Sequence, residues 1–261
     1  MISNCRVVLV RTHYPGNIGA AARAMKNFGL RDLVLVDPVA DLAAHQARML
    51  ATNGVDVLDA ARVVPDFEAA VADCGVVLAT GGETGGTLRE TVRGTPADLF
   101  PALAGALAAG PCALVFGPEP HGLTTAEVGR CHGLLHLPAD PEYPSLNLSL
   151  AVGICLYELR KYAAREEDKG EGTGRSAPAA RRGPAPFADL DRAMNHLHEA
   201  LTAVSFLHGQ NADALMHGFR HLVSRAHPTP QEVRMLHGLA RQLLFIAGRW
   251  KKTETRPPEG K

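Results

Sequence analysis

The sequence predicts an α/β domain built on a mostly parallel sheet, followed by a small helical appendage. Short apolar runs alternate with helix-forming segments through roughly the first 160 residues, the order expected when helices cover both faces of a parallel sheet. The next stretch is rich in glycine, alanine, proline and charged residues, which is typical of a flexible linker. After it, apolar residues recur at helical spacing. We therefore expect a domain, a linker, an extension of two or three helices and a frayed tail, at residues 1–164, 165–186, 187–250 and 251–261.

The composition narrows the class of protein. Apolar residues make up 46% of the 261 residues, which is enough for a substantial core. No run of about eighteen apolar residues occurs, so we expect no membrane span. The first residues lack the apolar core of a signal peptide, and we expect the protein in the cytoplasm. A formal net charge of +0 argues only weakly against a nucleic-acid partner, because a local basic face on a neutral protein also binds phosphate.

Apolar runs and turn signals predict the individual strands and helices. Strands are expected where β-branched and other apolar residues form short runs, at Cys5–Val10, Leu33–Val36, Val76–Ala79 and Ala113–Phe116. Residues of high helix propensity lie between them, and helices are expected over 20–28, 42–50, 67–72 and 97–109. Gly29 is the expected C-cap of the first helix. Thr124 and Glu127 form the capping-box pattern that opens a further helix.

Residues 134–160 connect an apolar run, which stops at Pro138, to a later helix. Pro141 and Pro144 hold the following segment extended, because proline restricts its own φ and the residue before it. Ser145 stands where an N-cap is expected, ahead of a helix with apolar residues at helical spacing. Such a rigid loop leaves backbone polar groups free to hold a ligand. By itself, this stretch is explained equally well as an ordinary connection between a strand and a helix.

Two further stretches have the same strand-and-turn character. Residues 17–23 read Asn-Ile-Gly-Ala-Ala-Ala-Arg, and residues 114–123 read Leu-Val-Phe-Gly-Pro-Glu-Pro-His-Gly-Leu. Together with residues 134–160 they resemble the three motifs of the SpoU/TrmH family of RNA ribose 2′-O-methyltransferases, over about residues 5–160. The Pro-Glu-Tyr-Pro-Ser-Leu-Asn segment at 141–147 and the C-terminal helices are most similar to the TrmJ subfamily, which methylates position 32 in the tRNA anticodon loop.

This resemblance implies a narrower fold and a set of partners. The family belongs to the SPOUT methyltransferases, whose α/β domain contains a trefoil knot, a threading that general rules of chain topology disfavour. The resemblance also implies S-adenosylmethionine as the cofactor, tRNA as the substrate and a homodimer. The helix expected over residues 148–159 has more apolar surface than one face of a monomer needs, which agrees with a dimer.

The resemblance also assigns a catalytic role to Arg23. In the family, the matching arginine acts on the ribose 2′-hydroxyl as a general base. Because a guanidinium has a pKa above about 12, clamping the RNA phosphate and stabilising the developing oxyanion is the easier role. An ordinary surface arginine is the alternative. Asn17 would orient Arg23 or the ribose, or simply begin the helix.

Three polar residues of the other motifs complete the candidate catalytic set. Glu119 lies between Pro118 and Pro120, so its carboxylate has little chain freedom, and the matching family residue supports the active-site arginine or its loop. Ser145 and Asn147 offer a hydroxyl and an amide at the start of the last motif helix. A solvated turn is the alternative role for Glu119, and helix capping is the alternative for Ser145.

The candidate cofactor site lies in three loops. Gly117 permits close approach of the backbone to a ligand. Leu137 and Leu146 would face the adenine, with Pro144 and Ser145 beside them. The resemblance places further cofactor contacts directly after the third strand, at Thr80, Gly81 and Gly82.

Other classes of function are open at this point. One is a nucleotide enzyme with Gly16-Asn-Ile-Gly19 as a phosphate loop, although this stretch lacks the Gly-x-Gly-x-x-Gly fingerprint and a Walker lysine. Another is a non-catalytic RNA-binding relative, or an enzyme for a different tRNA or rRNA nucleotide. The chain also departs from the subfamily after Gly82, where an arginine is common but Glu83 follows and the next arginine is Arg89.

The appendage is a second candidate contact for RNA or for a partner subunit. Its last helix opens with a capping box at Thr229 and Glu232. Its basic residues could follow a phosphate backbone if they share a face, and they are Arg220, Arg225, Arg234, Arg241, Arg249, Lys251 and Lys252. We expect the appendage to serve tRNA binding or dimer contact without building the cofactor pocket. His217 and His221 share a helix face, but no third metal ligand stands at suitable spacing, and the five cysteines are scattered, so we expect no metal site.

Overall fold

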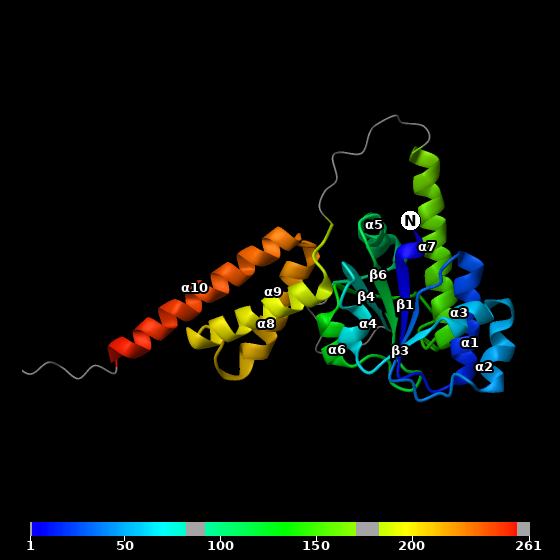
Figure 1. Ribbon diagram of the computed structural model, residues 1–261, viewed down its shortest axis with the longest axis horizontal. Coiled ribbons are helices and arrows are strands. Elements are labelled where there is room, and N and C mark those ends of the chain that lie inside the picture. The colour runs from blue at the N-terminus through cyan, green and yellow to red at the C-terminus, as the bar shows by residue number, and fades with distance from the viewer. Residues whose placement is uncertain (1, 82–91, 171–182, 255–261) are drawn as a thin grey trace, which may run out of the picture.

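The computed structural model describes residues 2–81, 92–170 and 183–254, and it is organised around one sheet (Figure 1). Seven strands lie in the order β3-β2-β1-β6-β4-β7-β5, and neighbouring strands run parallel. The predicted parallel sheet is therefore confirmed. The strands are β1 (Cys5–Val10), β2 (Leu33–Val36), β3 (Arg62–Val64), β4 (Val76–Thr80), β5 (Arg93–Gly94), β6 (Cys112–Phe116) and β7 (Gly133–Leu135).

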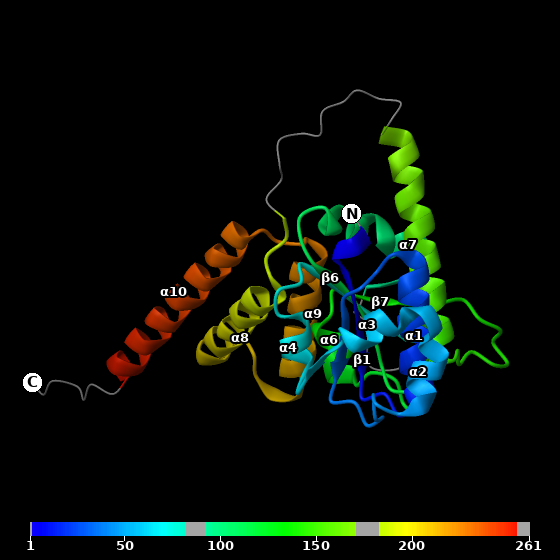
Figure 2. The ribbon, with the colours of Figure 1, turned by 45° about the vertical axis from the view of Figure 1, so that its right-hand side comes forward.

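Helices cover both faces of the sheet because the central strands are apolar on both sides. Val7 and Leu9 pack into one core, whereas Val8 and Val10 pack into another on the opposite face. Figure 2 shows the resulting three layers. The first face is covered by α1 (Pro15–Phe28), α2 (His45–Ala51), α3 (Val55–Asp59), α5 (Pro96–Leu107) and α7 (Leu148–Gly170). The second face is covered by α4 (Phe67–Val71) and α6 (Thr125–Arg130). Short 3-10 turns lie at Ile2–Asn4, Thr52–Gly54 and Gly209–Asn211.

The ends of three helices test the predicted caps. The first helix begins at Pro15, earlier than predicted, because proline is well suited to the first helical turn. Gly29 ends it with a φ of 79°, as predicted. The capping box of Thr124 and Glu127 at the start of α6 is confirmed. The expected N-cap at Ser145 is wrong.

Asn147 caps helix α7 in place of Ser145. Its side-chain oxygen accepts the N–H groups of Ser149 and Leu150 at 3.0 and 3.3 Å. The helix accordingly begins at Leu148. Ser145 is thereby left at an exposed position in the loop.

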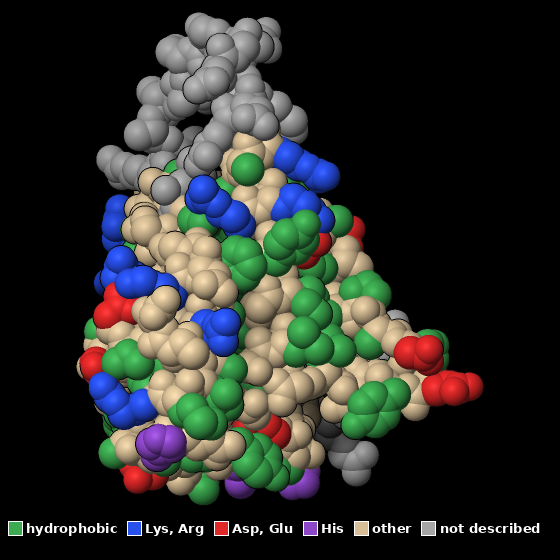
Figure 3. Space-filling model, turned by 90° about the vertical axis from the view of Figure 1, so that its right-hand side faces the viewer, with side chains coloured by type: hydrophobic (Ala, Val, Ile, Leu, Met, Phe, Trp, Pro, Cys, Tyr) green, Lys and Arg blue, Asp and Glu red, His purple; other side chains and the backbone are tan. Residues whose placement is uncertain are grey.

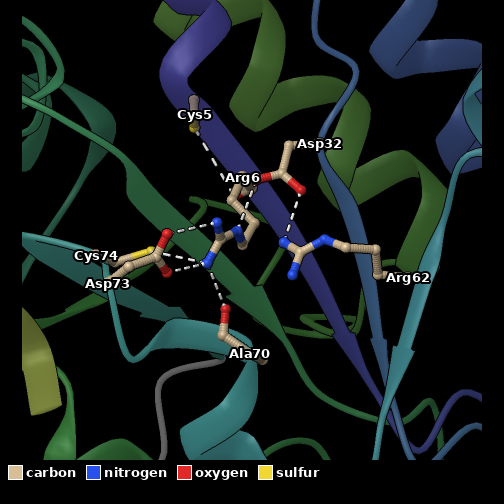
Figure 4. A network of polar contacts seen from close by, with 7 residues as sticks. All are labelled: Cys5, Arg6, Asp32, Arg62, Ala70, Asp73 and Cys74. Atoms are coloured by element: carbon tan, nitrogen blue, oxygen red, sulfur yellow. Dashed lines mark hydrogen bonds and ion pairs between the residues drawn. The ribbon is translucent and has the colours of Figure 1, made fainter.

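A buried arginine closes the amino-terminal edge of the sheet (Figure 4). Arg6 of β1 is only 5% exposed. Its guanidinium donates to both carboxylate oxygens of Asp73 at 2.6 and 3.0 Å, to Asp32 at 2.7 Å and to the carbonyl oxygen of Ala70 at 2.7 Å. Burial alone would lower the pKa of the guanidinium, but the hydrogen bonds to Asp73 and Asp32 outweigh it and raise the pKa. This charged network joins β1 to the residues that flank β2 and α4.

The appendage consists of α8 (Phe187–Ala203), α9 (Ala212–Arg225) and α10 (Pro230–Glu254). It has a core of its own, formed by Ala185, Leu190, Ala193, Met194, Leu197, Leu207, Met216 and Val233. In Figure 1 the far part of α10 extends away from the sheet. Arg220 donates to Asp191 of α8 at 2.6 Å, and its side chain is only 14% exposed. Of the basic residues considered for phosphate contact, Arg220 is therefore paired with a carboxylate inside the appendage.

The appendage packs against the sheet domain, which the linker-like sequence did not predict. The N–H of Phe187 donates to the carbonyl of Cys74 at 2.9 Å. The Phe187 ring meets that of Phe67 edge-on, with centroids 5.9 Å apart. Arg130 of α6 lies over both rings at 5.4 and 5.7 Å and donates to Asp191 at 3.2 Å. An aromatic and ionic contact thus joins α8 to α4 and α6.

Two stacked histidines form a second contact between the appendage and the sheet domain. His132, only 4% exposed, accepts the N–H of Val77 at 3.1 Å through Nδ1. Its ring stacks on that of His227, with centroids 5.7 Å apart. Burial, together with the neighbouring His227, lowers the pKa of His132 to about 3. His132 is therefore neutral at physiological pH.

The chain segments between these parts differ from the predicted boundaries. Helix α7 continues to Gly170, past the predicted start of the linker at 165, and α10 continues to Glu254, past the predicted start of the tail. Ala185, at the end of the predicted linker, is buried and donates to the carbonyl of Pro228 at 2.7 Å. The rest of the predicted linker, residues 171–182, lies outside the described residues.

Candidate active site

The loops that follow β4, β6 and β7 enclose a cavity at the carboxyl-terminal edge of the sheet. In a parallel sheet these strand ends meet at one edge, where ligands commonly bind. The cavity has a volume of about 360 Å³. Its lining consists of Thr80, Gly81, Phe116, Gly117, Pro118, Glu119, Pro120, His121, Gly122, Leu135, Leu137, Pro144, Ser145, Leu146, Leu148 and Ala151.

Most of the predicted cofactor-binding residues line this cavity. They are Thr80, Gly81, Gly117, Leu137, Pro144, Ser145 and Leu146, whereas Gly82 lies outside the described residues. The prediction missed apolar lining residues at the ends of strands and at the start of α7, such as Phe116, Leu135 and Leu148. The sequence could have indicated them, because each is the last or first apolar residue of an element. The carboxyl ends of parallel strands share an edge, where a ligand binds.

Glycine shapes the loop that follows β6. A Cβ atom on Gly117 would lie 2.3 Å from the backbone nitrogen of Leu123, so no other residue fits there without a shift of the loop. Gly122 has a φ of 68°, in the left-handed region, and its N–H donates to the carbonyl of Pro118 at 2.9 Å. These contacts fold residues 117–123, here called the cavity loop, back on themselves beside the cavity.

Glu119 connects the cavity loop to the loop that follows β1. Its carboxylate accepts the N–H of His13 at 3.0 Å, the N–H of Tyr14 at 3.4 Å and the side-chain amide of Asn17 at 2.7 Å. Burial alone would raise the pKa of Glu119, but these hydrogen bonds outweigh it and lower the pKa. Glu119 is therefore ionised at neutral pH and accepts at several positions at once. A carboxylate held in this way is not a solvated turn residue.

Asn17 and Asn147 extend this network to the third motif. The side-chain N–H of Asn147 donates to the side-chain oxygen of Asn17 at 3.0 Å. An ionised carboxylate only accepts hydrogen bonds, so the nitrogen of Asn17 must face Glu119 and its oxygen must face Asn147. Each of the two amides keeps one further N–H that can donate to a ligand. The network therefore joins all three motifs, and its two bonded pairs are 102 and 130 residues apart in the chain.

Arg23 lies apart from this network. It occupies an exposed position on α1, and it is not among the residues that line the cavity. Within the part of the chain that the structure describes, its guanidinium has no ion-pair partner. The structure thus brings together Asn17, Glu119, Ser145 and Asn147 at or beside the cavity, and leaves Arg23 free to meet a ligand from outside.

The glycines of the alternative phosphate loop have a packing role instead. Gly16 and Gly19 are buried inside α1. A Cβ atom on Gly19 would lie 2.0 Å from the carbonyl oxygen of Ala47, so this glycine allows α1 to approach α2 closely. A phosphate-binding loop places its glycines ahead of a helix, whereas Gly16 and Gly19 lie within α1. The nucleotide-enzyme alternative is therefore not supported.

The histidine pair of α9 and the longest helices were the remaining places for a metal site or a membrane span. The rings of His217 and His221 lie 4.3 Å apart, and no group of three or more His, Cys, Asp or Glu suited to a metal ion occurs among residues 2–81, 92–170 and 183–254. No helix among the described residues is long and apolar enough to cross a membrane.

Comparison with known proteins decides the family. The sequence model of the SpoU rRNA Methylase family matches residues 4–157, more than half of the chain. The chain belongs to this family. A second model, that of the tRNA methyltransferase TrmJ C-terminal domain, matches residues 188–256. The resemblance drawn from the three motifs is thus confirmed.

Relatives of known identity resemble the chain over nearly its full length. The tRNA (cytidine/uridine-2′-O-)-methyltransferase TrmJ of Klebsiella pneumoniae is 36% identical over 244 residues, which cover 92% of this chain and 96% of that protein. The protein of the same name from Escherichia coli K12 is 36% identical over 240 residues, covering 92% and 94% of the two chains.

Solved structures agree with this assignment to the SpoU methylase family. The crystal structure of TrmJ from Z. mobilis ZM4 superposes with a TM-score of 0.73 at 31% identity, covering 91% of this chain and 98% of that one. A probable methylase family protein from Haemophilus influenzae Rd KW20 superposes with a TM-score of 0.60 at 31% identity, covering 97% and 100%. The α/β fold with a C-terminal helical region is therefore that of the family, while the trefoil knot itself stays a prediction.

Proposed function

We propose that this protein transfers a methyl group from S-adenosylmethionine to a ribose 2′-hydroxyl of tRNA. The observation that carries the proposal is the meeting of three distant motifs at one cavity, joined by the hydrogen bonds among Asn17, Glu119 and Asn147. Membership of the SpoU methylase family and the tRNA 2′-O-methyltransferases among the relatives support it. A tRNA substrate also implies the cytoplasm as the place of action.

The cavity suits the proposed cofactor in size and character. Its volume of about 360 Å³ lies within the range of small-molecule sites, about 300–1,000 Å³. Phe116, Leu137 and Leu146 supply apolar surface for an adenine ring. Gly81 and Gly117 bring backbone close to the ligand without side chains in the way. When bound there, S-adenosylmethionine supplies a methyl group activated by its sulfonium.

The chain's own residues would position the ribose and stabilise charge. Transfer by in-line displacement needs the 2′-oxygen held about 3–3.5 Å from the methyl carbon, with a partner for the departing proton or the developing charge. The remaining N–H groups of Asn17 and Asn147 can hold ribose oxygens, and Ser145 presents a hydroxyl at the cavity wall. Glu119 holds the Asn17 amide in one orientation. Arg23 would contact the RNA phosphate and the developing oxyanion from outside the cavity.

We propose position 32 of the anticodon loop as the target nucleotide, on the likeness to the TrmJ subfamily. The test uses a tRNA transcript with cytidine or uridine at position 32 and a matched transcript with a 2′-deoxynucleotide there. With labelled S-adenosylmethionine, the protein should transfer label to the first transcript and none to the second. Equal labelling of both transcripts would show that the target is another nucleotide. If the protein binds the cofactor but methylates no tRNA or rRNA, it is a non-catalytic RNA-binding relative.

We further propose that the protein is a homodimer through the face formed by α1 and α7. Leu150 and Tyr157 of α7 are 52% and 53% exposed, more than a helix of a monomer usually leaves in water. Figure 3 shows hydrophobic side chains gathered along the middle of this face, with Lys and Arg mainly to one side. A dimer formed there would bring Arg23 to the boundary between subunits. Sedimentation equilibrium should give the mass of two chains at micromolar concentration, and a mass of one chain would exclude the dimer.

The appendage is proposed as the second tRNA contact or as a further dimer contact. Arg225, Arg234 and Arg241 are exposed and have no ion-pair partners in the described ranges. Phosphate contacts of this kind give affinity that falls with salt.

We accordingly propose the division into a catalytic domain and a C-terminal region that does not line the cavity. In the full chain, Arg234→Glu with Arg241→Glu should weaken tRNA binding at least about tenfold at low salt and leave S-adenosylmethionine affinity unchanged. If this double variant binds tRNA as well as the wild-type protein does, the appendage serves the dimer contact instead.

A further inference from the structure

Arg11 is the first residue after β1, at the edge of the sheet where the cavity lies. Its backbone has a φ of 46°, in the left-handed region that residues other than glycine and asparagine seldom adopt. Its N–H donates to the carbonyl of Val36, the last residue of β2, at 2.8 Å. Arginine is strained in this conformation.

The side chain of Arg11 makes a two-pronged ion pair with Glu127 of α6. Nη1 lies 2.6 Å from Oε1, and Nη2 lies 2.9 Å from Oε2. The two side chains are 33% and 13% exposed, so water screens this pair less than an exposed one. Glu127 also accepts the N–H and the hydroxyl of Thr124 at 2.8 and 2.9 Å. The pair therefore attaches the segment after β1 to the first turn of α6.

The cavity loop lies directly ahead of α6 and is tied to the same segment at a second point. Glu119, inside the loop, accepts the N–H groups of His13 and Tyr14. Glu127, beyond the loop, accepts from Arg11. Two carboxylates thus flank the part of the loop that contains Gly122. Both bind the segment that begins with Arg11 and leads to Asn17.

We propose that Arg11 is a positioning residue for the cofactor cavity, which acts through Glu127 by holding the α6 end of the cavity loop against the segment that carries Asn17. The inference rests on the proposed function, since it concerns the same cavity. Arg11 is not among the lining residues, so it does not touch the ligand. Without the ion pair, the loop keeps the contacts of Glu119 but shifts at its α6 end. The binding-competent arrangement is then populated less, and the apparent cofactor affinity falls in proportion.

The opposite end of β1 supplies a matched control. Arg6 forms the same two-pronged ion pair with Asp73, at 2.6 and 3.0 Å, on the edge of the sheet away from the cavity. Asp73→Asn and Glu127→Gln each turn the carboxylate of such a pair into an amide of the same shape. Both variants keep their structural context, since Asp32 still neutralises Arg6 and glutamine serves in a capping box as glutamate does.

The experiment measures the affinity of the full-length protein for S-adenosylhomocysteine by calorimetric titration, together with the thermal unfolding temperature. The variants are Arg11→Asn, which suits the left-handed backbone, Arg11→Lys, Glu127→Gln and Asp73→Asn. Arg11→Asn and Glu127→Gln should weaken binding about five- to tenfold, within the usual range of coupling between sites. Arg11→Lys, which keeps the charge but not the fork, should lose less. Asp73→Asn should lower the unfolding temperature and leave affinity within about twofold.

The Arg11→Asn/Glu127→Gln double variant should bind no more weakly than either single variant, because both remove one ion pair. Wild-type affinity in Arg11→Asn and Glu127→Gln, or equal losses in Asp73→Asn, would overturn the inference. If one variant fails to fold, the others decide. A wild-type protein that does not bind S-adenosylhomocysteine would instead contradict the proposed function, so the two failures are distinguishable.

Discussion

Strand β1 carries an arginine ion pair at each end, and the two ends differ in what surrounds the pair. At the amino-terminal end, Arg6 is buried and meets Asp32, Asp73 and a backbone carbonyl. At the carboxyl-terminal end, Arg11 is one-third exposed, has a strained backbone and borders loops that enclose a cavity. In the first network the guanidinium is buried and its carboxylate partners reach the surface. The second network lies next to the amides of Asn17 and Asn147, which keep N–H groups for a ligand.

The difference shows how one strand serves both stability and function. At the amino end the charged groups satisfy each other, so removal of one costs folding free energy without changing a ligand site. At the carboxyl end the ion pair of Arg11 and the amides of Asn17 and Asn147 hold together loops that border a cavity. Under the proposed function, a bound cofactor would complete this site. Variants at the two ends should therefore change different quantities.

The largest expected effect is on stability, at the amino end. Arg6→Met should lower the free energy of unfolding by about 3 kcal/mol, the low end for breaking a buried pair, because Asp73 and Asp32 are partly exposed and can be hydrated. Urea denaturation measures the loss. Affinity for S-adenosylhomocysteine should stay within about twofold under conditions where the variant is folded. If the loss of binding free energy exceeded the loss of unfolding free energy, the amino end of β1 would also serve the ligand site, and the distinction between the two ends would be wrong.

A loss of activity of similar size in free energy is expected from Arg23→Ala. Methyl transfer to tRNA should fall by a factor on the order of 10²–10³, as when one stabilising donor of an oxyanion is removed. The exposed position of Arg23 predicts a change in stability within about 0.5 kcal/mol. Cofactor affinity should stay within a few-fold, because Arg23 does not line the cavity. Near-normal turnover would remove Arg23 from the mechanism.

Glu119→Gln should lower both stability and turnover, unlike the variants at Arg6 and Arg23. The amide nitrogen would face N–H donors, which leaves at least one donor unpaired and costs about 1–2 kcal/mol of stability. Turnover should fall about tenfold, because Asn17 loses the partner that orients it. Turnover and denaturation are measured on the same preparation. Stability loss without loss of turnover would make Glu119 purely structural.

The smallest effect is a pH dependence of stability at His132, at the amino end of β7. Its pKa is about 3 in the folded protein against about 6.5 unfolded. Above pH 6.5 both states are neutral. As pH falls below 6.5, the unfolded state binds a proton that the folded state does not, so stability falls until about pH 3. At pH 5.5 this difference is about 1.4 kcal/mol.

His132→Asn isolates this titration, because the asparagine oxygen can replace Nδ1 as acceptor for the N–H of Val77. Between pH 7.5 and 5.5 the wild-type protein should lose about 1.4 kcal/mol more stability than the variant. Cofactor affinity should not follow this titration, since Glu119 stays ionised over the same range. Parallel pH profiles for the two proteins would show that His132 does not carry the dependence.

Local patterns in the sequence determined much of the fold. The apolar runs at Cys5–Val10 and Leu33–Val36 became strands with the predicted bounds, because a strand buried on both faces needs only a short apolar run. Gly29 and the capping box at Thr124 ended and began helices as predicted, since a cap depends on residues within one turn. The motifs in order also identified the SpoU methylase family.

Only the tertiary structure decided which polar residues meet. Arg11 and Glu127 are 116 residues apart, and Asn17 and Asn147 are 130 apart. Their contacts depend on the strand order β3-β2-β1-β6-β4-β7-β5, which no local period encodes. The capture of Arg220 by Asp191 and the packing of Phe187 on Phe67 likewise needed the position of the appendage. Periodicity reflects interactions over a few residues, whereas these bonds form only after distant elements have packed together.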